Sequence, residues 1–216
     1  MSLLLLGATG DLALERLAAF CWERHEDVQV EAGEWGDPPP RVLWTPKDYL
    51  ISYRSRWIVP PEVLRATRNM AINFHPGPPE YPGYAPACWA LYHNAATFGV
   101  TCHQMTEQVD AGTILAVSTF SLAGVDTVAG VLQRAHTRME VLAYDVVGWL
   151  LKGYTIMPVL QWTWGTIRTR ADLERLATLT PDMTEAEMRR RIRAVTYGPW
   201  RARMVVNGIT FKEDGA

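Results

Sequence analysis

The chain has 216 residues, a formal net charge of −2 and 48% hydrophobic residues, which is the composition of one sizeable folded domain. The near-neutral charge argues against a large nucleic-acid substrate, because phosphate backbones are bound by an excess of Lys and Arg. Three cysteines without CxxC spacing argue against a disulfide framework or a zinc site and favour a reducing, cytoplasmic environment. The apolar run at 2–6 is too short for a signal core or a membrane span and predicts a buried strand.

The first half of the chain alternates short apolar runs with segments of helical periodicity. Strands are predicted at 2–6, 28–30, 49–53 and 70–74, helices at 11–25 and 60–67, and a loop rich in Gly and Pro at 33–46. This alternation predicts an α/β fold with a largely parallel sheet. Ligands of such sheets bind beyond the carboxyl ends of the strands, where Asn73 and His75 are expected.

The second half adds two further strands and a long helix. A helix is predicted at 87–94, strands at 99–105 and 113–121, and an amphipathic helix at 126–152 that ends before Gly153. An aromatic stretch, a charged helix at 184–193 and a hairpin at 202–211, turning at Asn207 and Gly208, follow it. We therefore expect a Rossmann-like domain over residues 1–152 and a small C-terminal helix and β-hairpin extension over residues 153–216.

Three polar side chains provide the chemical groups that acyl transfer needs. Asn73 and His75 stand two residues apart at the end of an apolar strand, so both project to the same side. Asp110 lies in a glycine-flanked loop between two further strands. An amide can stabilise an oxyanion, an imidazole can transfer a proton, and a carboxylate can tune the imidazole. Each residue alone also has an ordinary structural explanation, but their order and spacing favour the functional one.

The motifs in which these residues occur resemble those of the folate-dependent formyltransferases. The family pattern N-x-H-P-S/G, Y-x-G, H-x-M and D-x-G-x-I is matched at 73–77, 81–83, 103–105 and 110–114. The resemblance is strong over 49–121 and weak before residue 44. Two departures stand out: the stretch before Asn73 is short, so that one strand–helix unit is abbreviated, and Gly77 replaces the more usual Ser.

The resemblance implies a fold, a reaction and a set of site residues. It implies a Rossmann-like formyltransferase catalytic, folate-binding domain, 10-formyltetrahydrofolate as co-substrate, no metal, and Asn73, His75 and Asp110 as the catalytic trio. The residues expected to bind the folate are Arg54, Ser55, Arg56, Trp57, Ile58, Gln108, Val109 and Asp110. Those expected to bind the acceptor are Tyr81, Gly83, Trp89 and Met105. His103 is expected to be a packed, hydrogen-bonded strand residue rather than a catalytic one.

The acceptor amine is inferred from the length of the extension. Its intermediate size and an R-A-x-x-Y-G stretch at 193–198 resemble the sugar N-formyltransferases, which act on nucleotide-linked 4-amino-4,6-dideoxy sugars of bacterial surface polysaccharides such as O-antigen. Such an enzyme is expected to be a cytoplasmic homodimer acting on a small molecule, without nucleic-acid or membrane partners. The alternatives are an amino acid or peptidyl amine, glycinamide ribonucleotide, methionyl-tRNA, or a non-catalytic folate- or nucleotide-binding protein.

Two further motifs are assigned ordinary roles. The Gly-Ala-Thr-Gly turn at 7–10 is similar to that of nicotinamide-binding reductases, but it lacks the third glycine needed for close helix packing and no Tyr-x-x-x-Lys pair follows. The arginine run at 189–193 follows Glu185 and Glu187 at helical spacing. This favours a solvated helix face with intrahelical ion pairs over a phosphate-binding patch.

Overall fold

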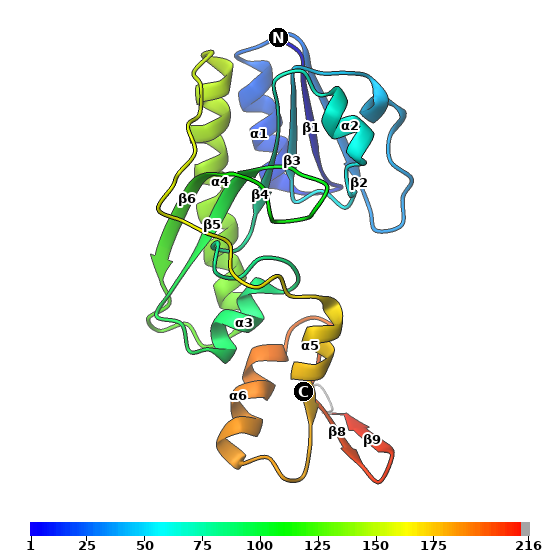
Figure 1. The fold of residues 1–216 in the computed structure, drawn as a ribbon, viewed down its shortest axis with the longest axis vertical. Helices are drawn as coiled ribbons and strands as arrows, with labels where there is room; N and C mark the ends of the chain where they lie inside the picture. Colours follow the sequence, from blue (N-terminus) through cyan, green and yellow to red (C-terminus); the bar gives the residue numbers. More distant parts are fainter. Residues whose placement is uncertain (213–216) are drawn as a thin grey trace.

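A six-stranded sheet forms the centre of the computed structural model, which describes residues 1–212 (Figure 1). Its strand order is β2-β1-β3-β4-β5-β6. The first four strands pair in parallel, β5 is antiparallel to β4, and β6 is antiparallel to β5. The strands are β1 (Leu3–Ala8), β2 (Val28–Gly33), β3 (Tyr49–Tyr53), β4 (Met70–His75), β5 (Thr97–Gln104) and β6 (Ile114–Ser121). The predicted α/β class and largely parallel sheet are confirmed.

Seven helical segments accompany the sheet within the described residues. They are α1 (Leu12–Trp22), the 3₁₀ turn η1 (Arg41–Trp44), α2 (Pro61–Ala66), α3 (Pro86–Tyr92), α4 (Val128–Leu151), α5 (Arg170–Leu176) and α6 (Glu185–Val195). The side chain of Asp11 caps α1 by accepting the Ala13 N–H at 3.0 Å. The long helix α4 ends at Leu151 and is followed by Lys152 and Gly153. The φ of Gly153 is 76°, the left-handed conformation that glycine adopts most readily.

The two faces of the sheet pack against different partners. The larger core lies between the sheet and the helices α1, α3 and α4, and it receives Ile72 and Phe74 of β4. A smaller cluster on the opposite face gathers residues of β1, β3, β4, η1 and α2, namely Leu4, Leu6, Leu43, Leu50, Val59, Val63 and Ala71. Because side chains alternate along a strand, Asn73 and His75 project to this second face.

The connection between β2 and β3 contains the four-residue turn η1 as its helical segment. Leu43 of this turn is 2% exposed and supplies the apolar cover.

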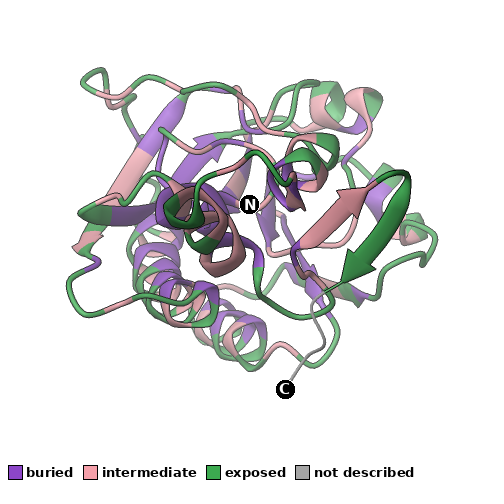
Figure 2. Ribbon diagram, turned by 90° about the horizontal axis from the view of Figure 1, so that it is seen from below, coloured by how far each residue is buried: buried purple, intermediate pink, exposed green. Residues whose placement is uncertain are grey.

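The C-terminal part is a compact helical unit with a small sheet at the lower end of the molecule in Figure 1. Its strands are β7 (Thr178–Leu179), β8 (Arg203–Val206) and β9 (Ile209–Lys212), and β9 is exposed along its length (Figure 2). The predicted helix and hairpin are confirmed, with Asn207 and Gly208 at positive φ in the turn. Helix α5, which the sequence analysis did not predict, begins with a capping box between Thr169 and Asp172. Residues 213–216 of the expected extension lie outside the described residues.

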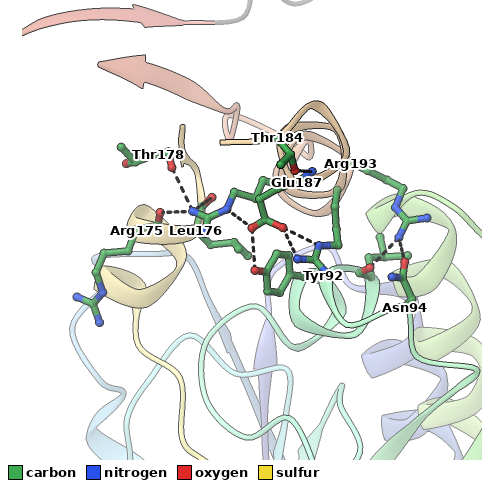
Figure 3. Close-up of polar contacts among 11 residues, drawn as sticks. Tyr92, Asn94, Arg175, Leu176, Thr178, Thr184, Glu187 and Arg193 are labelled. Atoms are coloured by element: carbon green, nitrogen blue, oxygen red, sulfur yellow. Dashed lines mark hydrogen bonds and ion pairs between the residues drawn. The ribbon is translucent and has the colours of Figure 1, made fainter. Parts of the chain in front are cut away.

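Glu187 joins this unit to the rest of the molecule. Its carboxylate accepts a hydrogen bond from the Tyr92 hydroxyl of α3 at 2.9 Å and from Arg191 Nε at 2.6 Å, and it also pairs with Arg190 (Figure 3). Arg191 in turn donates to backbone carbonyls at the end of α5 and in β7. The arginine run thus forms intrahelical ion pairs, as expected, and also fixes α6 against α3 and α5.

Candidate active site

Asn73 and His75 lie at the carboxyl end of β4, where the sheet changes from parallel to antiparallel pairing. The Nδ1 atom of His75 is 3.1 Å from Oδ2 of Asp110. Both side chains are about 95% buried. The three predicted catalytic residues are therefore in one place, with His75 and Asp110 in direct contact.

Asp110 is held by a tight turn between β5 and β6. Its φ of 49° is unusual for a residue other than glycine, and its Oδ2 accepts the Gly83 backbone N–H at 2.9 Å. Two residues on, a Cβ at Gly112 would lie 1.9 Å from the Gln104 carbonyl oxygen, so this position requires glycine. The Asp-x-Gly spacing of the motif thus serves the geometry that points the carboxylate inward.

The environment of Asp110 favours its charged form. Burial raises the pKa of the carboxyl, but the charge of His75 and its hydrogen bond outweigh the effect of burial and hold the pKa well below its usual range. Asp110 therefore remains a carboxylate over the neutral pH range.

Both ring nitrogens of His75 face oxygen acceptors. Nδ1 faces the Asp110 carboxylate, and Nε2 lies 3.1 Å from the Tyr81 carbonyl oxygen. A neutral imidazole carries one N–H, whereas an imidazolium carries two, so the doubly protonated ring satisfies both contacts. A Cβ at Gly77 would lie 2.6 Å from Nε2. The glycine that departs from the family's usual serine therefore leaves space for the ring.

A fourth side chain, His103 of β5, completes the cluster. It stands directly opposite Asn73 in the antiparallel register, and its Nε2 is 3.2 Å from Asn73 Nδ2 and 3.2 Å from Asp110 Oδ1. It is buried and hydrogen-bonded, as the sequence suggests. Its contact with two members of the trio depends on the β4–β5 register and on a bulge at 102–103, neither of which is visible in the sequence.

Trp164 covers the two imidazoles from the segment between α4 and α5. Its ring lies 5.1 Å from that of His103 and 6.2 Å from that of His75, edge to face in both cases. Its Nε1 donates to the Gly112 carbonyl at 2.7 Å. We call residues 154–169 the strap, because this segment also forms backbone hydrogen bonds to Pro79, Pro82 and Tyr84 beside the site.

A cavity of about 470 Å³ opens next to this cluster. Asn73, His75, His103 and Asp110 all contribute to its wall. All the residues predicted to bind the folate line it as well: Arg54, Ser55, Arg56, Trp57, Ile58, Gln108, Val109 and Asp110. The sequence analysis missed Trp35 and His136, which also line it and come from the β2–β3 connection and α4.

The four residues predicted to bind the acceptor are placed differently from one another. Gly83 and Met105 line the cavity. Tyr81 contributes its carbonyl to His75 and stacks its ring on Phe98. Trp89 is 5% exposed, donates to the Tyr84 carbonyl and lies beneath the guanidinium of Arg168, which makes it a packing residue in this structure.

Within residues 1–212, no cluster of His, Cys, Asp and Glu is arranged to hold a metal ion. Over the same residues, no helix combines the length and the apolar character needed to cross a membrane.

Comparison with known proteins shows which folds and sequences this chain is similar to. Residues 48–147 match the family model described as formyl transferase. The fold resembles a sugar N-formyltransferase from Shewanella, with 18% identity and a TM-score of 0.80 over 99% of this chain and 96% of that one. It also resembles a 4-N formyltransferase from Francisella tularensis, with 17% identity and a TM-score of 0.79 over 98% and 96% of the two chains. HypX from Aquifex aeolicus, solved with tetrahydrofolic acid, shares 22% identity and a TM-score of 0.68 over 97% of this chain and 36% of that chain.

At these identities the solved structures establish a shared fold, and the family model matches the part of the chain that carries the site. The matched residues run from the start of β3 into α4 and include Asn73, His75, His103 and Asp110. Over residues 48–147 the chain is therefore similar to the formyl transferases.

Proposed function

We propose that this enzyme transfers the formyl group of 10-formyltetrahydrofolate to the primary amine of a nucleotide-linked 4-amino-4,6-dideoxy sugar. One observation carries the proposal: the Asn73, His75 and Asp110 cluster forms part of the wall of the cavity that the predicted folate-binding residues line. Such a cavity brings a donor carbonyl and acid–base groups together, which is what direct acyl transfer requires.

In the proposed reaction, the neutral amine attacks the formyl carbon and the formyl oxygen gains negative charge. The Asn73 amide donates to that oxygen, and the positive charge of His75, fixed by Asp110, stabilises it electrostatically. A water molecule bound to Asp110 relays the proton that the attacking nitrogen loses to the folate nitrogen as the C–N bond of the donor breaks. The proton count is balanced, because the acceptor nitrogen loses one proton and the leaving nitrogen gains one.

The shape and chemistry of the cavity suit a pterin ring. Trp57 and Ile58 of the loop after β3 offer apolar surface, and backbone groups of 108–110 can pair with the polar edge of the ring. Arg56 lies above the ring of Trp35, 5.1 Å from its centre, at the side of the same cavity. The folate bound to HypX, a protein of the same fold, agrees with a folate donor here.

The acceptor is proposed from the position of the strap and from the charge of the chain. The strap lies directly beside the Gly83–Tyr84 segment through Arg168, which supports a role for the C-terminal unit in acceptor binding. The net charge of −2 favours a small molecule over tRNA. This chain covers 96% of the sugar N-formyltransferase from Shewanella and 96% of the 4-N formyltransferase from Francisella tularensis. This coverage agrees with a sugar acceptor.

The test is a panel of acceptors with 10-formyltetrahydrofolate as the donor, read by mass spectrometry of the product. Nucleotide-linked 4-amino-4,6-dideoxy sugars are expected to be formylated faster than amino acids, glycinamide ribonucleotide or methionyl-tRNA. Efficient formylation of methionyl-tRNA that falls steeply with salt would reverse the choice of acceptor. Folate binding without turnover of any amine would instead indicate a non-catalytic folate-binding protein.

A further inference from the structure

One ring nitrogen of His103, Nε2, has two neighbours that compete for its single hydrogen bond. Its Nδ1 lies 3.0 Å from the Gln104 carbonyl oxygen, which only accepts, so Nδ1 carries a proton. Its Nε2 lies 3.2 Å from both the Asn73 amide nitrogen and Asp110 Oδ1. Nε2 can accept from the amide when the ring is neutral or donate to the carboxylate when the ring is a cation, but it cannot do both.

We propose that His103 is a positioning residue that orients the Asn73 amide for catalysis while its ring is neutral with the proton on Nδ1. In this state Nε2 accepts one N–H of Asn73, and the second N–H of the same amide points to the formyl oxygen. A second proton on His103 would turn Nε2 into a donor, and the Asn73 amide would have to rotate and present its oxygen instead. The donor to the developing oxyanion would then be lost. The inference rests on the proposed function and deepens it.

Burial limits the alternatives for this contact. His103 is 2% exposed, so a lost partner is not replaced by bulk water. Among residues 1–212, the Asn73 side chain forms one hydrogen bond, and its partner is His103. The two residues are cross-strand partners in the β4–β5 register, and this pairing fixes the separation of their side chains.

The neighbours of His103 are one carboxylate, one imidazole and groups that do not titrate. The titratable groups that face it are Asp110, in the loop after β5, and His75 of β4 behind that carboxylate. Its other neighbours, Asn73, the Gln104 carbonyl and Trp164 of the strap, do not titrate. Arg54, Arg56, Glu107 and His136 line the same cavity.

Two substitutions of His103 distinguish a role in orienting the Asn73 amide from a role in packing alone. Gln at this position can offer an oxygen to Asn73 and an N–H to Asp110 without titrating, whereas Leu fills space and offers neither. We expect His103→Leu to lower kcat about 10- to 100-fold while the dissociation constant for the donor stays within about twofold, because misplacing one catalytic group has effects of this size. His103→Gln is expected to recover most of that loss and to flatten the acidic limb of the kcat profile.

Nitrogen NMR of the unliganded full-length protein with labelled histidine tests the ring state without any turnover. The neutral Nδ1–H form of His103 is expected at pH 7.5, and its protonation at lower pH should move the Asn73 amide signals with the same midpoint. A cationic His103 at pH 7.5 would overturn the proposal even in an active enzyme. So would normal kcat in His103→Leu, or a Gln variant that binds donor, folds by circular dichroism and is as slow as the Leu variant. An inactive parent enzyme with the expected ring state would instead reject the proposed function.

Discussion

The carboxylate of Asp110 and the imidazole of His75 are in contact at 3.1 Å, and the Gly83 backbone N–H binds the same carboxylate oxygen. Asp110→Asn keeps the size of the side chain but removes the charge that compensates the His75 cation. We expect a loss of about 100- to 1000-fold in kcat, with little change in donor affinity. Steady-state kinetics with isothermal titration of the donor measures both, and unchanged kcat would show that the charge of Asp110 is dispensable.

Gly77 is expected to control the position of the His75 ring. In Gly77→Ala the new methyl group would meet His75 Nε2 at 2.6 Å and the Cβ atom of Pro86 at 2.7 Å. Moving the ring should lower kcat at least tenfold, and the crowding should destabilise the fold by about 1–3 kcal/mol. Gly148→Ala is the matched control. Gly148 lies in the interior of α4, and its new methyl group would lie at an ordinary contact distance of 3.4 Å from Phe20. That variant should keep kcat and gain about 0.5–1 kcal/mol of stability.

Trp164 is expected to matter for catalysis although it belongs to the strap. Trp164→Ala exposes the two imidazoles to water and weakens the charge interactions among them, so kcat should fall about tenfold or more. Trp164→Phe keeps an aromatic ring, loses the hydrogen bond to the Gly112 carbonyl and should be milder. Trp162→Ala, on the same strap beside Tyr81 and Phe98, provides the comparison. Equal kcat in the Trp164→Ala and Trp162→Ala variants would argue against a role for Trp164 in shielding the site.

His136 is expected to make folding stability depend on pH. Burial, and then the charge of Arg54, lower the pKa of His136 to about 4, below the value of about 6.5 in an unfolded chain. Its contribution is therefore fully present above pH 6.5 and is lost as the pH falls through 4, up to about 2 kcal/mol after allowance for its partial exposure. Urea unfolding at several pH values should show a smaller slope in this window for His136→Phe. An identical slope in both proteins would assign the pH dependence to other groups.

The sequence predicted the parts of the site that are carried by local pattern. Apolar runs followed by turn residues marked β1, β3 and β4, and the motifs marked Asn73, His75 and Asp110. The contact of His103 with the trio depends on long-range register, and the position of Trp164 depends on how an irregular segment returns to the sheet. Neither has a periodic signal. Helix α5 is seven residues long, too short for its periodicity to stand out.

The central claim is that the Asn73 amide and the His75 cation stabilise charge that develops on the formyl oxygen. Their value then lies in the transition state, so that losing either side chain slows turnover more than it weakens binding. Because the two act on one oxygen, Asn73→Ala combined with His75→Ala should cost less than the product of the single losses.

The most direct test is kcat for His75→Ala with 10-formyltetrahydrofolate and the best acceptor of the panel, after circular dichroism shows that the variant is folded. The account predicts a loss of at least about a hundredfold with donor affinity nearly unchanged. Turnover close to that of the parent enzyme would contradict it.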